Sequence, residues 1–306
     1  MIRVASYDDV PEGAALRQRA WPDSIITAEG MQHFLEATPE RAERLLLAFE
    51  EAGELVGWAS AGREWSRSDP THGYVEISVD PAHRGRRIAS QLMDEVEAHL
   101  SQLGVTTARA ESLDEPAARA LAERRGFTES GSSSTSAVDP RSVLPLPLPP
   151  DVTVVPFGEL DDPEPVWALD LEVSRDLPNE EFDAVSLDEW SKAFWRSPIV
   201  DDDASLVAFV DGELVAMTMI RIDRDGGRAM NNLAGTRRAF RGRGIATALK
   251  SQSLSRAAEL GATMVITDNE ELNAPMLAVN ARLGYRPFSR RIAWERRAVS
   301  EPDARG

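Results

Sequence analysis

The sequence predicts an α+β protein made of two similar domains in tandem, and three observations support this. The chain of 306 residues is long enough for about two domains. An arginine- and glycine-rich phrase occurs twice, as PAHRGRRIASQL at 81–92 and RAFRGRGIATALK at 238–250. Each copy stands between a β-type run and a helical pattern. We therefore expect an N-terminal domain at 1–140, a proline-rich linker at 141–150 and a C-terminal domain at 151–300.

The two halves keep a common register well beyond this phrase. Arg84 and Arg241, which open the RGR motif of each copy, are 157 residues apart. Gly126 and Gly284, each followed by an aromatic residue, are 158 residues apart, so one residue has been inserted. A chance repeat would not hold its register over such a distance, and we infer an internal duplication.

Upstream of the phrase, each half predicts a first strand and then a hairpin with a two-residue turn. The first strands are predicted at 2–4 and 152–154. The hairpins are predicted at 45–60 and 205–220, with their turns at Ala52-Gly53 and Asp211-Gly212.

Two segments of biased composition lie between the halves. VLPLPLPP (143–150) has too many prolines for a helix or an inner strand, so we expect a stiff extended connector. SGSSSTSA (130–137) has the composition of a flexible tail. It occupies the place that SRRIAWER (289–296) takes in the second half, however, and we expect a polar edge strand, with the flexible tail as the alternative.

Each copy of the phrase connects a strand to a helix. The strands are predicted at 74–79 and 231–236, and Gly104 and Gly261 stand where helix-terminating glycines belong. The apolar faces predicted for the two helices are Ile88, Leu92, Val96, Leu100 and Leu103 in the first half, and Ala246, Leu249, Ser253, Ala257 and Leu260 in the second.

The turn between strand and helix predicts an anion-binding site. The first N–H groups of a helix have no intrahelical partner and coincide with the positive end of the helix dipole. Gly244 has no Cβ and lets a phosphate approach the backbone, while Arg241 and Arg243 supply positive charge. The alternative is a solvated turn without a ligand. A dinucleotide (Rossmann) site fits less well, because Thr247 stands where a third small residue belongs.

Composition excludes several other classes of site and partner. The chain has no cysteine, so it has no disulfide, thiolate zinc site or cysteine nucleophile. A formal net charge of −17 argues against nucleic acid as a partner. No apolar run approaches the roughly 20 residues of a membrane span, and the first residues do not resemble a signal peptide. We expect a cytoplasmic protein without a metal or a membrane partner; monomer and homodimer both stay open.

Two motifs resemble one known family. Arg241-Gly242-Arg243-Gly244-Ile245-Ala246 matches the Arg/Gln-x-x-Gly-x-Gly/Ala signature of the GNAT superfamily of acyl-CoA N-acyltransferases. TDNEELNAPMLAVNARLGYRP (267–287) resembles the segment that follows in those enzymes. Because the pattern recurs in both halves, the chain resembles a tandem protein of this family.

The resemblance implies two GNAT domains, each a mixed, mostly antiparallel sheet with flanking helices, in which two parallel strands splay apart. Acetyl-CoA (CoA) would enter this gap, and a small-molecule primary amine would attack the thioester directly. The implied cofactor-binding residues of the second half are Ala234, Gly235, Thr236, Arg241, Gly242, Arg243, Gly244, Ile245, Ala246, Thr247, Asn273, Met276 and Asn280. Those of the first half are Ile77, Ser78, Val79, Arg84, Gly85, Arg86, Arg87, Ile88, Ala89 and Ser90.

The resemblance leaves the acid and the base of the reaction open. In many family members a tyrosine protonates the departing thiolate, but this position is Asn280 here and Ala122 in the first half. Tyr285 is a second candidate acid, with a core position as its alternative. Asp268 is the candidate base of the second half, with a turn or cap role as its alternative. Glu76 is the candidate base of the first half.

The first half departs further from the family pattern. Arg87 replaces the glycine, and Glu115 and Ala122 stand where the second half has Asn273 and Asn280. CoA binding is therefore weakened in expectation but not excluded. We expect the second half to catalyse, and the first half to hold CoA without turnover at most.

The segment 161–203 would supply the acceptor pocket. Its acidic and aromatic side chains together suit a cationic amine; the alternative is an acidic, solvated helix face with buried tryptophans. The residues concerned are Trp167, Glu172, Asp176, Asp183, Asp188, Glu189, Trp190, Trp195 and Asp201–Asp203.

Two other functions compete with acetyl transfer. A catalytically silent protein that senses or scaffolds through bound CoA would explain the missing tyrosine and the unassigned base. A nucleotide-binding oxidoreductase is a more distant possibility, which a response to NAD(P) would reveal.

Overall fold

The computed structural model describes residues 1–175 and 185–297 and divides into two compact units. Unit 1 consists of Met1–Ala20, Glu40–Ser132 and Arg291–Gly306, described to Arg297. Unit 2 consists of Trp21–Pro39 and Ser133–Arg290. Each unit therefore takes segments from both repeats.

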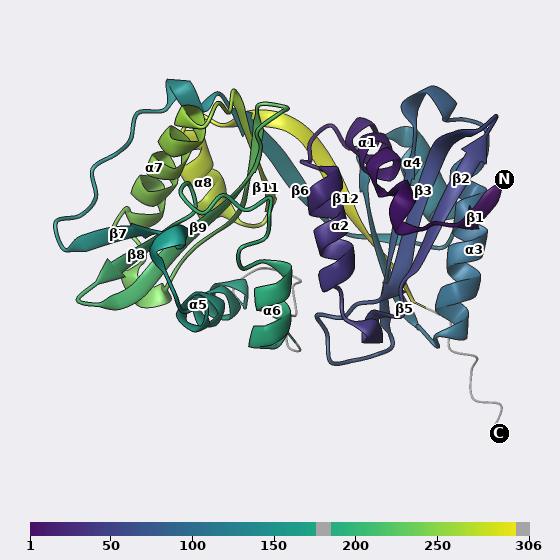
Figure 1. The fold of residues 1–306 in the computed structure, drawn as a ribbon, viewed down its shortest axis with the longest axis horizontal. Helices are drawn as coiled ribbons and strands as arrows, with labels where there is room; N and C mark the ends of the chain where they lie inside the picture. Colours follow the sequence, from purple (N-terminus) through teal and green to yellow (C-terminus); the bar gives the residue numbers. More distant parts are fainter. Residues whose placement is uncertain (176–184, 298–306) are drawn as a thin grey trace. The chain divides into compact units, whose positions relative to one another are not determined.

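Unit 1 contains one mixed sheet with helices packed against it (Figure 1). Its strand order is β1 (Ile2–Val4), β2 (Leu45–Glu51), β3 (Glu54–Arg63), β4 (His72–Val79), β5 (Thr107–Leu113) and β12 (Arg286–Arg297). Every pairing is antiparallel except that between β4 and β5. The helices are α1 (Val10–Ala20), α3 (Ile88–Gln102) and α4 (Pro116–Arg124).

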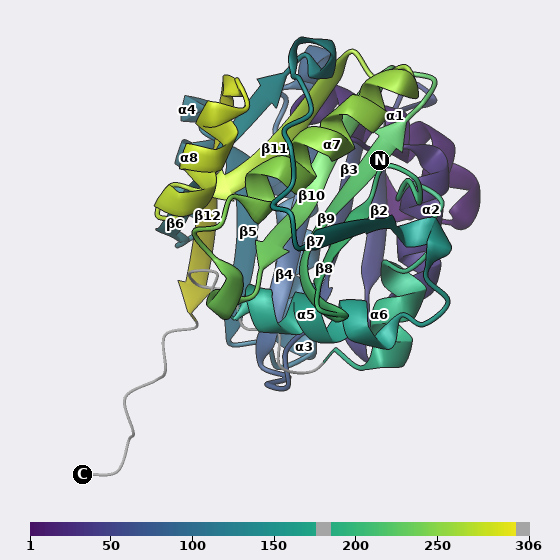
Figure 2. The same ribbon diagram turned by 90° about the vertical axis from the view of Figure 1, so that its left-hand side faces the viewer.

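Unit 2 repeats this plan. Its strand order is β7 (Val152–Pro156), β8 (Leu206–Val210), β9 (Glu213–Asp223), β10 (Arg228–Thr236), β11 (Met264–Glu270) and β6 (Thr128–Val138), and only β10 and β11 pair in parallel. The helices are α2 (Ala28–Ala37), α5 (Glu164–Ser174), α6 (Leu187–Ala193), α7 (Ile245–Glu259) and α8 (Ala274–Arg282). Figure 2 shows α7 lying along the strands β8, β9 and β10, against which it packs.

The structure confirms the α+β fold and the predicted hairpins. Both hairpin turns have two consecutive residues with positive φ: 54° and 86° at Ala52-Gly53, and 49° and 81° at Asp211-Gly212. This is the type I′ geometry, whose twist matches that of the flanking strands.

The parallel strands of each unit separate part-way along their length, as the resemblance implies. β10 pairs with β11 only over Arg228–Asn231, although it pairs with β9 as far as Thr236. In unit 1, β4 pairs with β5 only over His72–Val75, although it pairs with β3 as far as Val79. We call the point of separation the apex; it follows Asn231 in unit 2 and Val75 in unit 1.

The last strand of each repeat belongs partly to the other repeat's sheet. β6, from the first repeat, pairs with β11 from Ser133 to Val138. β12, from the second repeat, pairs with β5 from Arg291 to Arg297. The strand predicted at 130–137 is thus confirmed, and the flexible-tail alternative is wrong. The edge position was wrong, because β6 lies between β12 and β11 in the strand order.

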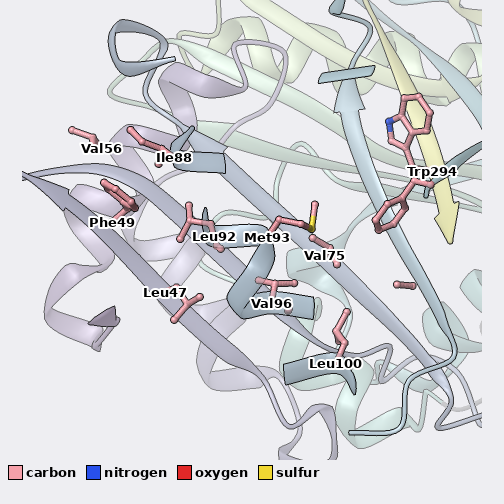
Figure 3. Packing of buried hydrophobic residues seen from close by; sticks show 14 of the residues in the cluster. Leu47, Phe49, Val56, Val75, Ile88, Leu92, Met93, Val96, Leu100 and Trp294 are labelled. Carbon is pink, nitrogen blue, oxygen red and sulfur yellow. The ribbon is translucent and has the colours of Figure 1, made fainter. Parts of the chain in front are cut away.

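Apolar side chains from both repeats build the cores. In unit 1, Ile292 and Trp294 of β12 join the cluster formed by α3 and the strands of the first repeat, which includes Leu92, Met93 and Val96 (Figure 3). Of the predicted face of α3, the four residues Ile88, Leu92, Val96 and Leu100 are buried, and Leu103 caps the helix end.

The proline-rich segment 143–150 forms neither helix nor strand. It does not run free, because Val143 and Leu146 pack against the core of unit 2. The backbone N–H of Leu146 donates to Ser251 Oγ on α7 at 2.8 Å. Packing as well as proline stiffness therefore holds this segment.

Residues 1–175 and 185–297 contain neither a membrane-spanning helix nor a cluster of metal ligands. None of the helices there combines the length and the apolarity that crossing a bilayer requires. No group of three or more histidine, aspartate or glutamate side chains is placed there to hold a metal ion.

Candidate functional site

The corner at residues 241–244 connects β10 to α7 and exposes the start of that helix. All four residues are exposed, and Gly244 is the N-cap, with φ 81° and ψ 2°. The first backbone bond of the helix joins Ala248 N–H to Gly244 O at 3.0 Å. The N–H groups of Ile245, Ala246 and Thr247 precede this bond and are available to an external acceptor.

The backbone at Gly244 is bare and open to an approach from outside. A Cβ added at Gly242 or Gly244 would meet nothing within 4 Å, so packing does not demand glycine at either position. The left-handed conformation favours glycine but does not require it, because Arg87 has a φ of 64° at the equivalent N-cap of α3. The corner therefore leaves open the approach to the helix N–H groups that an anion such as a phosphate needs.

The two arginines of the corner already have partners. Arg241 Nε donates to the carbonyl oxygen of Thr236 at 2.9 Å and so ties the corner to the end of β10. Arg243 Nη2 lies 2.5 Å from a carboxylate oxygen of Asp151 and lowers the pKa of that carboxyl group. A bound diphosphate would therefore compete with Asp151 for the charge of Arg243.

At the corresponding corner of unit 1, two arginines are paired with carboxylates. Arg84 pairs with Glu115 at 2.9 Å, and Arg86 pairs with Glu51 at 2.7 Å. Arg87 places a side chain where unit 2 has Gly244. The start of α3 at Ile88, Ala89 and Ser90 keeps the same open N–H groups, because its first bond joins Gln91 N–H to Arg87 O at 3.1 Å.

The strand edges predicted to hold the pantetheine arm lie beyond the apex. Ala234, Gly235 and Thr236 pair with β9, and the pairing with β11 has already ended at Asn231. In unit 1, Ile77, Ser78 and Val79 pair with β3, and the pairing of β4 with β5 has already ended at Val75. Both units thus present a backbone edge towards the gap.

Asn273 and Met276 form a helix cap. The Oδ1 atom of Asn273 accepts a hydrogen bond from Met276 N–H at 3.3 Å, and Asn273 is the N-cap of α8. The Asn273 side chain is therefore engaged in starting the helix.

A buried polar network lies at the apex of unit 2, on the side of α7 and α8. Lys250 Nζ donates to Asn280 Oδ1 at 2.5 Å and to Thr267 Oγ1 at 3.4 Å. Asn280 Nδ2 donates to Asn269 Oδ1 at 2.5 Å. Thr267, whose hydroxyl donates to Asn231 O at 3.3 Å, is the last residue of β11 paired with β10. The network therefore begins at the apex and follows β11 into the gap.

The sequence-based reasoning missed Lys250. Its side chain is completely buried, and burial lowers the pKa of its amine to about 7. The ring centroid of Tyr285 lies 4.8 Å from Nζ. Burial raises the pKa of the Tyr285 hydroxyl, which has no hydrogen-bond partner in the described part of the chain. Tyr285 belongs to the hydrophobic core, the position given above as its alternative.

Asp268 lies at the same apex but on the opposite face of β11 from Thr267, because successive side chains of a strand alternate. Its Oδ1 atom accepts hydrogen bonds from Ser133 Oγ and Thr135 Oγ1, both at 2.9 Å. Thr135 Oγ1 also lies 3.3 Å from Asp23 Oδ2. Both hydroxyls come from β6, so the exchanged strand holds the candidate base.

Glu76, the candidate base of unit 1, lies on β4 rather than on β5, the strand that corresponds to β11. It is the first residue of β4 beyond the pairing with β5, and its exposed carboxylate lies 3.0 Å from Arg17 Nη2. In unit 2 the repeat places Leu233 there. Unit 1 therefore has carboxylates on both strands, Glu76 on β4 and Glu111 at the repeat position of Asp268 on β5, whereas unit 2 has only Asp268 at these two positions.

The acidic and aromatic side chains of 161–203 are largely engaged in packing. Trp190 is buried and donates through Nε1 to Asp170 at 2.6 Å, while the rings of Trp195 and Phe157 stack at 5.6 Å. Asp201 is buried and pairs with Arg224. Asp176 and Asp183 lie outside the described residues. This segment therefore matches the alternative of buried tryptophans more closely than an open cation pocket.

Sequence comparisons agree with this geometry. The model of the acetyltransferase (GNAT) family matches residues 13–127 and 171–285. A mycothiol acetyltransferase from Saccharomonospora viridis is 30% identical over 284 residues, which cover 88% of this chain and 86% of that protein. A mycothiol acetyltransferase from Clavibacter sepedonicus is 26% identical over 303 residues, which cover 96% and 95%.

Solved structures share the fold over nearly the whole chain. A tandem GNAT protein from the clavulanic acid biosynthesis pathway has a TM-score of 0.76 at 20% identity and covers 99% of each chain. A GCN5-related N-acetyltransferase from Sphaerobacter thermophilus has a TM-score of 0.73 at 18% identity, with 98% and 97% covered. With the family model matched twice, the chain belongs to the acetyltransferase (GNAT) family and is a tandem N-acetyltransferase.

Proposed function

We propose that this enzyme transfers the acetyl group of acetyl-CoA to a primary amine on a small molecule, and that the second repeat, residues 151–300, carries the reaction. One observation supports this choice above all. Unit 2 combines an open glycine corner with polar side chains at its apex, whereas unit 1 has Arg87 at its corner. The first repeat, residues 1–140, would then be non-catalytic.

The residues that would hold the cofactor follow from the corner and the strand edge. The N–H groups of Ile245, Ala246 and Thr247 would receive the diphosphate, and the edge at 234–236 would receive the pantetheine arm. When bound, acetyl-CoA supplies an activated acyl group as a thioester. The chain itself supplies position, which is a large part of catalysis when two reactants must meet.

Asp268 is the proposed proton acceptor for the amine. It lies at the apex, where β10 and β11 separate, and two hydroxyls fix its carboxylate. An amine that approaches on this face would meet the carboxylate of Asp268, and Asp23 lies beyond Thr135 on the same side. Two carboxylates would attract the protonated amine before it loses its proton. The relatives named mycothiol acetyltransferase favour a small-molecule acceptor.

A panel of small amines with acetyl-CoA, read by the release of free thiol, tests this proposal. We expect release with the wild type and none with Gly244→Glu, whose carboxylate would repel the diphosphate. Arg87→Glu is the matched control in unit 1 and should keep full activity. Equal loss in both variants, or none in either, would place the reaction elsewhere.

A second candidate function is a CoA-binding protein without turnover. The observation that favours it is Leu233, which leaves β10 without a carboxylate at its apex. Binding of CoA without thiol release for any amine in the panel would favour this alternative. A cytoplasmic location stays a prediction.

A further inference from the structure

Lys250 has a role that acetyl transfer, as proposed above, does not yet use. Its amine is completely buried and donates to Asn280 and Thr267. Among the described residues it has no carboxylate partner. Burying an amine in this way disfavours its charged form and costs free energy of folding, so its retention here points to a functional role.

Unit 1 shows that the fold does not require this network. The repeat offset of 157 residues places Met93 at the position of Lys250 and Ala110 at that of Thr267; the offset of 158 places Ala122 at that of Asn280. Met93 is buried in the core of unit 1 (Figure 3). Ala110 and Ala122 pack against the same cluster. The same architecture is thus built with apolar side chains in one unit and polar ones in the other.

The network lies along the path that the proposed function gives to the thioester. Thr267 is the last paired residue of β11, and Asn269 is two residues further along the edge that faces the gap. Asn280 joins Lys250 to Asn269. Among the described residues Asn280 Nδ2 donates only to Asn269 Oδ1, which uses one of its two hydrogens.

We propose that Lys250 is a positioning residue that, through Asn280, stabilises the thiolate leaving from the acyl donor. This inference rests on the proposed function of unit 2. In the transfer step the acceptor nitrogen forms a bond to the acyl carbon, the carbon–sulfur bond breaks, and its electron pair stays on sulfur. The proton lost by the nitrogen goes to Asp268. The second Nδ2–H of Asn280 meets the charge on sulfur, and Lys250 strengthens that N–H by polarising the amide from its oxygen.

The proposed mechanism requires the charged form of Lys250, whose population depends on the groups around its amine. Burial lowers the pKa of its amine to about 7, so the charged form is present below that pH. Thr267 faces it from the sheet, Asn280 faces it from α8, and the Tyr285 ring lies over Nζ. Of these residues only Tyr285 titrates, and its pKa is raised, so it stays neutral.

Coenzyme A itself is the probe that tests this inference, because its thiolate absorbs in the ultraviolet. We expect the thiolate fraction of CoA bound to the wild type at neutral pH to exceed that of CoA bound to Lys250→Met by about tenfold. Lys250→Gln keeps a hydrogen-bond donor without the charge and should behave like Lys250→Met. Met93 in unit 1 indicates that methionine fits this position.

Binding is measured separately as the rise in melting temperature with CoA. Equal thiolate fractions in the wild type and Lys250→Met, with CoA bound to both, would overturn the inference and leave the proposed function intact. A wild-type thiolate fraction in Lys250→Gln would also overturn it, because a hydrogen bond without charge would then suffice. Failure of the wild type to bind CoA would overturn the proposed function, and this inference with it.

Discussion

Gly244 and Arg87 share one backbone conformation, with φ of 81° and 64°, at the N-caps of equivalent helices in the two units. The corner is thus built in the same way whether or not the residue carries a side chain. What differs is access to the N–H groups behind it, because only at Gly244 is the backbone bare. The predictions below begin from this difference.

We expect one molecule of CoA per chain. The corner of unit 2 is open, whereas in unit 1 a side chain at Arg87 and the carboxylates of Glu51 and Glu115 stand beside the same helix start. Native mass spectrometry with CoA counts the sites directly. Two bound molecules would show that Arg87 does not obstruct unit 1.

Replacing Arg87 with glycine should stabilise unit 1. A side chain in the left-handed region destabilises the folded state by about 1–2 kcal/mol, which the glycine variant avoids. Glycine loses more conformational freedom on folding, however, and this offsets roughly 0.5–1 kcal/mol of the gain. The net gain in unfolding free energy is therefore about 0.5–1 kcal/mol, measured by urea denaturation. Arg86→Gly is the neighbouring control: it loses the pair with Glu51 and should not stabilise.

Lys250→Met should change the pH dependence of stability. The pKa of Lys250 is lowered by burial from 10.5 to about 7, so between these values the unfolded chain binds more protons than the folded one. Stability from this group is therefore complete above about pH 10.5 and is lost as the pH falls towards 7. The wild type should gain about 3–4 kcal/mol relative to Lys250→Met between pH 7 and pH 10.

Unfolding in urea at several pH values measures this difference. The chain's other lysine provides the control: Lys192 is exposed and pairs with Asp188 at 2.7 Å. Lys192→Met should leave the slope of stability against pH unchanged. A Lys250→Met variant whose slope equals that of the wild type would show that the amine keeps its ordinary pKa.

Asp268→Asn should lower kcat for acetyl transfer by about 10²–10⁴ if Asp268 takes the proton of the amine. The amide oxygen can still accept from Ser133 and Thr135, so the fold should be preserved. Glu76→Gln, at the apex of unit 1, should leave kcat unchanged. The opposite pattern in steady-state kinetics would assign the reaction to unit 1.

Trp294→Ala should destabilise unit 1, although Trp294 belongs to the second repeat. Its indole is buried in the core of unit 1, and its Nε1 donates to Ser112 Oγ at 2.9 Å. Loss of such a side chain costs about 3–5 kcal/mol. Hydrogen exchange should show the loss of protection in β5, to which β12 is paired. Phe288→Ala, at an exposed position of the same strand, is the control.

Much of the local structure could be predicted from periodicity and turn chemistry. The hairpins at 45–60 and 205–220 form because Ala52-Gly53 and Asp211-Gly212 take the turn geometry that their strands require. The helix starts at Ile88 and Ile245 also fall where the phrase predicts them. The candidate base and the buried lysine were harder to predict, because the environments of Asp268 and Lys250 depend on contacts with residues that are distant in the sequence.

The sequence by itself determined the duplication, the strand–corner–helix order of each half and the open backbone at Gly244, since all of these arise from local spacing. Only the tertiary structure decided that β6 and β12 complete each other's sheets and that Lys250 is buried beside Asn280. The alternating side chains of a strand are compatible with any neighbouring strand of matching register, so they do not specify which strand it pairs with. A lysine in a helical pattern predicts an exposed position, so the local pattern does not indicate that Lys250 is buried. The choice between such partners is made by the packing of the whole unit.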